Sequence, residues 1–164
     1  MKKFPRSLLV MWGVFSVVNA STLFAQNVTA KDEKGAAVCK LNVNSDGIML
    51  KGSDVVACLK EGKPVQGDPA ITTTYHGATY LFASAANKAD FDKNPEKYVP
   101  QYGGFCAYGV SLGVLADPEG PGAFIVYKGK LYECGNQGAL KSFKSDIDKN
   151  IDSADKNWRQ LNGS

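Results

Sequence analysis

The sequence lacks most of the patterns by which common enzymes are recognised. It contains no Gly-x-Ser-x-Gly elbow, no His-Glu-x-x-His and no phosphate-binding loop, which removes the simplest signatures of serine hydrolases, zinc proteases and nucleotide-binding enzymes. The single histidine, His76, excludes a site built from several imidazoles of one chain. A binding or interaction module is therefore favoured over an enzyme, with thiol chemistry as the remaining catalytic option.

The sequence also has no C-x-x-C pair, because Cys39, Cys58, Cys106 and Cys134 lie far apart in the chain. This spacing removes the simplest signatures of thioredoxin-like exchange, structural zinc and covalent haem attachment. In an oxidising compartment, an even number of cysteines suggests disulfides, each contributing about 2–4 kcal/mol. The spacing alone leaves all pairings open.

No hydrophobic run is long enough to span a bilayer. Residues 8–18 are apolar, but a spanning helix needs ~20 residues. Three basic residues precede this run, and Ala20 and Ala25 are candidate cleavage positions, of which Ala25 is preferred because a polar segment follows it. Residues 1–25 are therefore predicted to be a secretory signal peptide.

Beyond the predicted signal, no charge of either sign is in excess. The chain has 19 Lys and Arg against 16 Asp and Glu, and the three basic residues of the signal account for the difference. Lys and Asp/Glu are interspersed, so the basic stripe that nucleic acids select is missing. We expect an exported, periplasmic protein that binds no nucleic acid and has no membrane span once its signal is removed.

The remaining chain has the pattern of a small, single α+β domain. Residues 26–40 are polar and are predicted to be a flexible leader, followed by the domain over residues 41–164. Residues 85–93 are predicted to form a short helix capped by Ser84. A C-terminal amphipathic helical region is predicted from apolar residues at steps of three and four, namely Leu140, Phe143, Ile147, Ile151, Ala154, Trp158 and Leu161.

Three β-hairpins are predicted to pack with these helices. They cover residues 41–50, 71–82 and 124–132, and the first two have Asp46-Gly47 and His76-Gly77 at their turns. Such pairs favour the positive φ angles that tight hairpin turns require. The turn position also predicts that the His76 ring points into solvent.

One stretch carries the most specific pattern in the chain. Tyr75-His76-Gly77 lies at a hairpin, and residues 100–108 read Pro-Gln-Tyr-Gly-Gly-Phe-Cys-Ala-Tyr. With Gly129-Lys130-Leu131-Tyr132 and parts of residues 52–57, they resemble the YHS domain family. The resemblance is to its exported, periplasmic members, in some of which selenocysteine replaces the cysteine, and it extends from about Gly47 to Trp158.

The resemblance implies a ligand-binding or redox site at Cys106, at the edge of a pocket lined by some of Tyr75, Tyr80, Tyr102 and Tyr108. A position at the start of a helix lowers the pKa of a thiol, which supports a reactive Cys106. Free cysteine is also a common core residue, so a purely structural Cys106 stays open. No catalytic residue other than this thiol is suggested.

The family's link with metal handling implies copper or another soft metal ion as a cofactor, with Cys106 as a ligand and His76 as a lesser candidate. The Phe-Cys-Ser motif of transporter-attached relatives is replaced here by Phe82-Ala83-Ser84, which lacks the soft ligand pair. Cys58 and Cys134 stand where the family has tyrosine and a polar residue. This joint departure implies a Cys58–Cys134 disulfide.

Three functions follow from these observations. The first is an exported binding module that holds a soft metal ion or small ligand through Cys106. The second is a thiol redox protein in which Cys106 cycles, resolved by Cys39 or by another disulfide partner. The third is a disulfide-stapled interaction domain without small-molecule chemistry.

Overall fold

The structure of the chain is a computed structural model that describes residues 26–31 and 37–163. The predicted signal peptide lies outside these residues. The elements follow in the order β1 (Gln26–Lys31), β2 (Ala37–Val43), η1 (Leu50–Gly52), α1 (Val55–Glu61), β3 (Asp68–Tyr75), β4 (Ala78–Phe82), α2 (Ala85–Lys93), η2 (Pro95–Lys97), η3 (Gln101–Gly104), α3 (Ala107–Ser111), β5 (Phe124–Tyr127), β6 (Lys130–Glu133), α4 (Gln137–Ser145) and α5 (Ile147–Leu161), where η marks a 3₁₀ helix.

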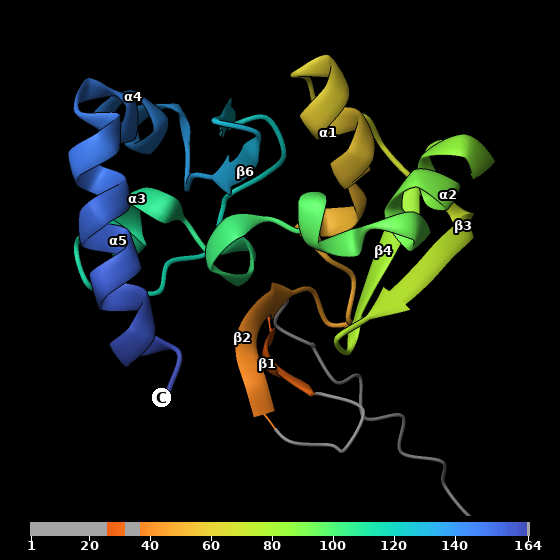
Figure 1. The fold of residues 1–164 in the computed structure, drawn as a ribbon, viewed down its shortest axis with the longest axis horizontal. Coiled ribbons are helices and arrows are strands. Elements are labelled where there is room, and N and C mark those ends of the chain that lie inside the picture. Colours follow the sequence, from red (N-terminus) through yellow and green to blue (C-terminus); the bar gives the residue numbers. More distant parts are fainter. Residues whose placement is uncertain (1–25, 32–36, 164) are drawn as a thin grey trace, which may run out of the picture.

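The fold is α+β, with short helices around three antiparallel hairpins, β1–β2, β3–β4 and β5–β6. Figure 1 shows β3–β4 with α1 and α2 on one side of the molecule and α3, α4 and α5 on the other. The η3 turn runs between the two sides, and β1–β2 lies below it. The predicted hairpins around His76-Gly77 and over residues 124–132 are confirmed.

Two hydrophobic clusters correspond to these two sides. The first is centred on Phe82 and Phe91 and includes Cys58, and the second is centred on Phe105 and Phe143 and includes Cys106 and Cys134. The predicted apolar stripe of the C-terminal region packs on the second cluster, where Phe143 and Ala154 are fully buried. The first cluster therefore combines α1 and α2 with residues of all three hairpins, whereas the second combines α3, α4 and α5 with β5–β6.

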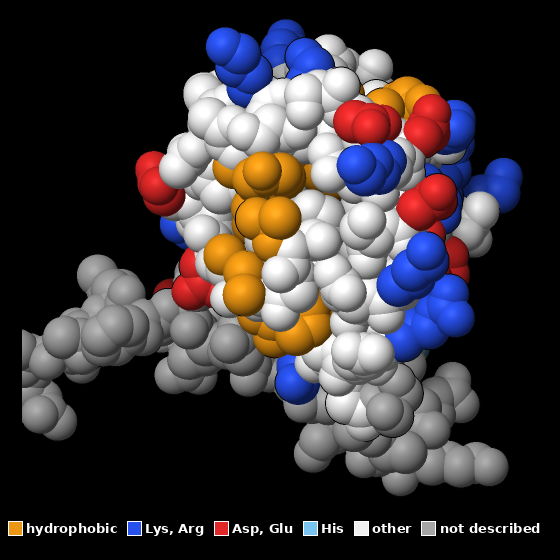
Figure 2. Space-filling model, turned by 90° about the vertical axis from the view of Figure 1, so that its left-hand side faces the viewer, with side chains coloured by type: hydrophobic (Ala, Val, Ile, Leu, Met, Phe, Trp, Pro, Cys, Tyr) orange, Lys and Arg blue, Asp and Glu red, His pale blue; other side chains and the backbone are white. Residues whose placement is uncertain are grey.

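The second side also exposes apolar surface. Among the described residues, Leu112 and Val114 are the large hydrophobic side chains that stay exposed, at 63% and 52%. Figure 2 shows hydrophobic side chains gathered on the face of the molecule that carries α5. Within the described part of the chain, no helix has the length and apolarity needed to cross a membrane.

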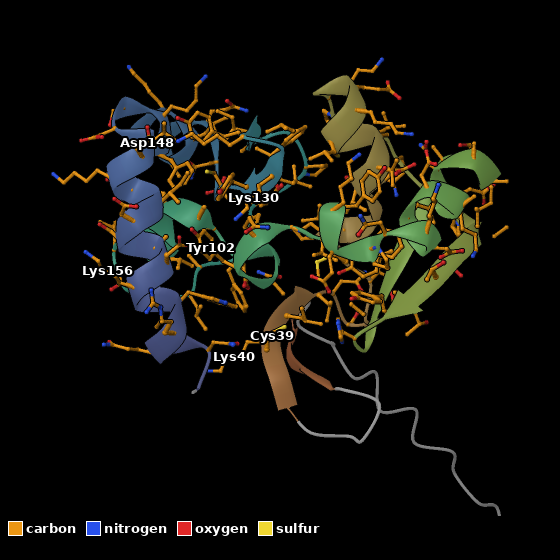
Figure 3. The ribbon with its side chains drawn as sticks, viewed as in Figure 1. Cys39, Lys40, Tyr102, Lys130, Asp148 and Lys156 are labelled. Carbon is orange, nitrogen blue, oxygen red and sulfur yellow. The ribbon has the colours of Figure 1, made fainter. Side chains whose placement is uncertain are left out.

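The predicted flexible leader is an ordered hairpin where the structure describes it. Residues 26–31 and 37–43 pair as β1 and β2, in a register that places Gln26 opposite Val43. The end of α5 holds β2, because the Lys40 backbone N–H donates to Asn162 Oδ1 at 2.6 Å and Lys40 Nζ donates to the Leu161 carbonyl at 2.6 Å (Figure 3). Long-range pairing thus orders a segment whose polar composition indicated a coil.

The predicted hairpin over residues 41–50 is only partly formed. The turn at Asn44–Gly47 is present, but Ile48 and Met49 make single bridges to Thr79 and Val43 and no second strand follows. Leu50 and Lys51 instead enter η1 with φ angles of 47° and 52°. The chain turns there, and α1 begins at Val55.

Asp54 ties the first cluster together. The side chain is fully buried, and its Oδ1 accepts from the Val56 and Ala57 backbone N–H groups at 2.8 and 3.0 Å, which caps α1. Its Oδ2 accepts from the Ala83 N–H at 2.8 Å and from Asn87 Nδ2 at 2.7 Å. One carboxylate therefore joins α1 to the end of β4 and the start of α2.

Replacing Asp54 with Ala should lower the free energy of unfolding by about 3 kcal/mol or more, because a helix cap and two further charge-assisted hydrogen bonds are lost. Chemical denaturation monitored by circular dichroism measures the change. Asp46→Ala, on the exposed turn, is the matched control and should change stability by less than about 0.5 kcal/mol. Equal effects of the two substitutions would contradict the role assigned to Asp54.

A candidate site: the buried Cys106–Cys134 thiol pair

Cys106 lies at the start of α3, as the sequence predicts, and serves as the N-cap residue of that helix. Its Sγ accepts from the Gly109 backbone N–H at 3.3 Å, one turn into the helix. It also accepts from the Gly135 N–H at 3.0 Å, which follows β6. The Cys106 backbone N–H is held by the Ala116 carbonyl at 2.9 Å, so the sulfur is fixed between two segments.

Cys134 brings a second thiol to the same point. It directly follows β6, and its backbone N–H donates to the Ala123 carbonyl at 2.7 Å. Its side chain is packed in the same cluster as Cys106, and the N–H of Gly135, the next residue, donates to the Cys106 sulfur. Cys134 is 0% exposed and Cys106 is 3% exposed, so the pair is enclosed in the second hydrophobic cluster.

The surroundings of the pair separate the pKa values of the two thiols. The hydrogen bond from Cys134 is the largest cause that lowers the pKa of Cys106 to about 6, against the opposing effect of burial, with help from the Gly109 and Gly135 N–H groups. The same hydrogen bond, together with burial, raises the pKa of Cys134. At neutral pH the pair therefore consists of a Cys106 thiolate and a Cys134 thiol.

The Cys58–Cys134 disulfide implied by the sequence is not formed, and all four cysteines are free. Cys58 is buried in the first hydrophobic cluster, whereas Cys134 lies in the second and contacts Cys106. Burial raises the pKa of Cys58 to about 11, so this thiol stays protonated. Cys58 and Cys134, which both depart from the family pattern, thus belong to different hydrophobic clusters.

Cys39 is also remote from the thiol pair. It lines a separate cavity of about 160 Å³, together with Met49 and residues of the first side of the molecule. Burial, followed by the charge of Glu96, raises the pKa of Cys39. The structure therefore makes Cys134, and not Cys39, the neighbour of Cys106.

The four tyrosines proposed around Cys106 divide between two places. Tyr102 and Tyr108 lie in the second cluster near Cys106, where the Tyr102 hydroxyl donates to Asp155 Oδ1 at 2.8 Å. Tyr75 and Tyr80 instead line the 160 Å³ cavity that contains Cys39. Burial is the main cause that raises the pKa of Tyr102 and of Tyr80, so neither phenol ionises near neutral pH.

His76 occupies the predicted turn, with φ of 50°, but its ring does not simply point into solvent. The ring packs edge-on against Tyr75, with centroids 4.1 Å apart, and its side chain is 34% exposed. Its Nε2 lies 3.7 Å from a carboxylate oxygen of Glu96, and the residue lines the same cavity as Cys39. His76 and Cys106 therefore do not share a site.

Glu133 is a site residue that the sequence analysis missed. It precedes Cys134 and is 4% exposed, and its side chain lines a small cavity. Burial, followed by the negative charge of Cys106, raises its pKa to about 8, while Lys51 opposes the rise. The available signal was a charged residue inside the otherwise apolar run Leu131–Cys134.

The described residues contain no group of three or more His, Cys, Asp or Glu side chains placed to hold a metal ion. The two candidate metal ligands lie apart, Cys106 in the second cluster and His76 at the cavity that contains Cys39, and a metal at either stays a prediction. What the structure does assemble is a thiolate beside a thiol. That arrangement suits reversible disulfide chemistry.

Comparison with known families identifies part of the chain. Residues 60–102 match the family model of the YHS domain. This segment is similar to the YHS domain. No curated protein and no solved structure gives a significant match.

The YHS match runs from the end of α1 to the first residues of η3, so it covers β3–β4 and α2 on the first side of the molecule. YHS domains are often linked with metal binding. The matched segment ends at Tyr102, before Cys106, so the thiol pair lies in the part of the fold that follows it. Membership of the exported type within the YHS family stays a prediction.

Replacing Cys134 with Ala should raise the pH at which Cys106 becomes reactive, because the strongest donor to its thiolate is lost. In the native chain, the rate of Cys106 alkylation by iodoacetamide should rise with a midpoint near pH 6, as the thiolate forms. Peptide mass spectrometry across a pH series gives the midpoint for each cysteine separately. In Cys134→Ala the midpoint should move upward.

Cys58→Ala is the matched control, since it removes a buried thiol from the other cluster and should leave the Cys106 midpoint unchanged. If the alkylation midpoint of Cys106 in the native chain lay near that of an ordinary thiol, Cys106 would be an inert core residue.

Proposed function

We propose that this protein is a redox-active dithiol module in which Cys106 and Cys134 cycle between two thiols and one disulfide. The observation that carries this proposal is the Cys106 sulfur, which accepts two backbone N–H groups, one of them from Gly135 directly after Cys134, and which is buried with Cys134 in the second cluster. A nucleophilic thiolate and a resolving thiol are then in contact before any substrate arrives.

Oxidation by a small-molecule disulfide proceeds in two exchanges. The Cys106 thiolate attacks one sulfur of the substrate, which forms a mixed disulfide and releases one small thiolate. Cys134 loses its proton, attacks the Cys106 sulfur and releases the second small thiolate. The pair has lost two electrons to the substrate, and the reverse sequence reduces it.

Burial restricts which substrates can reach the pair. Cys106 is 3% exposed and Cys134 is fully buried, so the surrounding residues of the second cluster would keep a disulfide in a folded protein from reaching either sulfur. The backbone of Gly135 covers the Cys106 sulfur, and a Cβ added at Gly135 would lie 3.6 Å from it. Small disulfides are therefore the substrate class that suits the site.

The stabilised thiolate indicates the direction of the chemistry. Hydrogen bonds that favour the reduced pair raise the reduction potential, which makes the disulfide a ready oxidant of other thiols. We place this activity in the periplasm, in line with the signal peptide predicted over residues 1–25, because an oxidising compartment keeps regenerating such a disulfide.

The test is a redox titration of the native chain in mixtures of a small thiol and its disulfide. Intact-mass measurement after rapid alkylation should show one reversible disulfide, and peptide mapping should assign it to Cys106 and Cys134 while Cys39 and Cys58 stay reduced. Cys106→Ser should abolish the reversible disulfide. His76→Ala, in the other half of the fold, should leave it unchanged.

Metal analysis of the same preparation separates the competing function. Stoichiometric copper that blocks alkylation of Cys106, without reversible disulfide formation, would replace the redox proposal by the soft-metal module implied by the family. If Cys106→Ser folds and behaves like the native chain in both assays, the protein is an interaction module with a cysteine in its core.

A further inference from the structure

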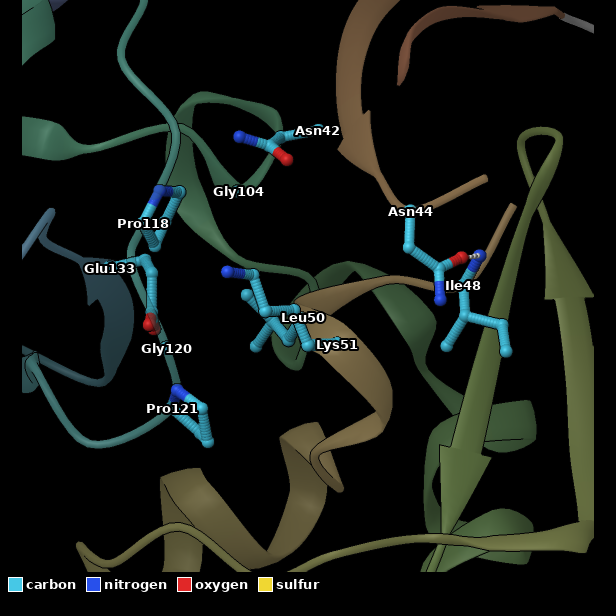
Figure 4. A pocket seen from close by; sticks show the side chains of 10 residues that line it. All are labelled: Asn42, Asn44, Ile48, Leu50, Lys51, Gly104, Pro118, Gly120, Pro121 and Glu133. Atoms are coloured by element: carbon cyan, nitrogen blue, oxygen red, sulfur yellow. Dashed lines mark hydrogen bonds between the residues drawn. The ribbon is translucent and has the colours of Figure 1, made fainter. Parts of the chain in front are cut away.

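The cavity that contains Cys39 has room for an organic molecule. Its volume is about 160 Å³, and Cys39 marks its β2 side (Figure 3). A second cavity, which Figure 4 shows between η1 and the loop before β5, has only about 30 Å³. A cavity of about 150 Å³ holds benzene, whereas one water needs about 10–15 Å³. Of these two spaces, the Cys39 cavity is therefore the one that suits a ligand.

The interior of this cavity is apolar and uncharged. Leu41, Met49 and Pro100 line it and are buried, and no Lys or Arg is among its described lining residues. Burial is the main cause that raises the pKa of Cys39, so its thiol stays neutral. A charged group taken into such an interior would find no compensating partner. An uncharged ligand therefore fits the interior best.

The polar residues of the cavity lie at its more exposed rim. The Glu96 side chain is 71% exposed and that of His76 is 34% exposed, and both line the cavity. The Tyr75 hydroxyl donates to Glu96 Oε1, and His76 Nε2 lies 3.7 Å from the same oxygen. The rim thus places one carboxylate at the entrance, which disfavours an anionic ligand.

Tyr80 supplies a polar group inside the cavity. Its ring packs on Phe91, with centroids 4.7 Å apart, and the residue is 3% exposed. No hydrogen bond among the described residues involves its hydroxyl. Buried side-chain oxygens of the described chain all have partners, so the Tyr80 oxygen touches open space, and the cavity is the space that Tyr80 lines.

This hydroxyl is a donor. Burial is the main cause that raises the pKa of Tyr80, with the charges of Cys39, Tyr75 and Glu96 adding to the rise, so the phenol keeps its proton. Cys39, Tyr75 and Glu96 all line the same cavity, which agrees with a hydroxyl directed into it. A ligand atom that accepts a hydrogen bond would complete the bonding of Tyr80.

We propose that the Cys39 cavity binds a small uncharged molecule, about the size of benzene, that is apolar except for one hydrogen-bond acceptor. Its apolar part lies against Leu41 and Met49, and its acceptor receives the Tyr80 hydroxyl. Binding is non-covalent. The site lies in the first cluster, away from Cys106 and Cys134, so it is independent of the thiol pair.

The test uses cyclohexanone, a ring with one carbonyl acceptor, and toluene, a ring with none. The probe is the methyl signal of Met49 in carbon-13 NMR, one of three methionines in the chain, which is assigned by its loss in Met49→Leu. Cyclohexanone should shift this signal saturably. Tyr80→Phe should weaken cyclohexanone binding about threefold to tenfold, the effect of one hydrogen bond, and leave toluene binding unchanged.

Tyr132→Phe is the matched control, because it removes a phenol from the second cluster and should leave the affinity for cyclohexanone unchanged. Tyr80→Phe should fold as the native chain does, since the lost hydroxyl bonds to no other described residue.

Three results would overturn the inference. The first is that neither ring compound shifts the Met49 methyl saturably. The second is equal affinity of the native chain and Tyr80→Phe for cyclohexanone, or tighter binding of the cyclohexylammonium ion, which would refute the hydrogen bond or the uncharged ligand class. The third is a stoichiometric shift of the Met49 methyl by cuprous ion alone, which would make the cavity a metal site.

Discussion

The site depends on one sharp turn of the backbone. Tyr102, Gly103 and Gly104 have consecutive positive φ angles of 54°, 61° and 82°, which reverse the chain as it passes from the first hydrophobic cluster to the second. A Cβ on Gly103 would lie 2.1 Å from the Lys40 carbonyl oxygen, so only glycine lets β2 pack against the turn. Phe105 and Cys106 enter the second cluster directly after it.

The turn also fixes the electrostatics of the thiol pair. Because Cys106 follows it as the N-cap of α3, the sulfur faces the Gly109 N–H, and β6 brings the Gly135 N–H and the Cys134 thiol from the opposite side. Donors from two distant segments converge on one buried atom. At Cys106 these donors outweigh burial, whereas at Cys58 burial is the largest cause and raises the pKa.

The YHS match and the thiol pair occupy different parts of one fold. The matched segment supplies the β3–β4 and α2 residues of the first cluster, whereas α3, β6 and the C-terminal helices build the second. Glu133 stands at their junction, since its cavity is lined by Leu50 and Lys51 of η1 and by Pro118 and Pro121 of the loop before β5. A link between YHS domains and metals therefore says little about the chemistry of Cys106.

Local patterns were sufficient for much of the fold. His76-Gly77 determined a tight hairpin because both residues adopt positive φ, and Ser84 capped α2 through the Asn87 N–H at 3.1 Å. The three- and four-residue apolar spacing of the C-terminal region determined α4 and α5 and the face they bury. The pattern ending in Phe105-Cys106 located the candidate cysteine and its place at a helix start.

Only the tertiary structure decided what each of these residues meets. The sequence offered Cys39 or an unnamed disulfide partner for Cys106 and paired Cys58 with Cys134, whereas folding placed Cys134 against Cys106 and left Cys58 in the other cluster. Likewise, the buried positions of Asp54 and Glu133 were not visible in the sequence, because their burial depends on segments far away in the chain. Hydrophobic periodicity and turn chemistry are local, whereas the pKa of a thiol or carboxyl depends on distant groups that packing brings to it.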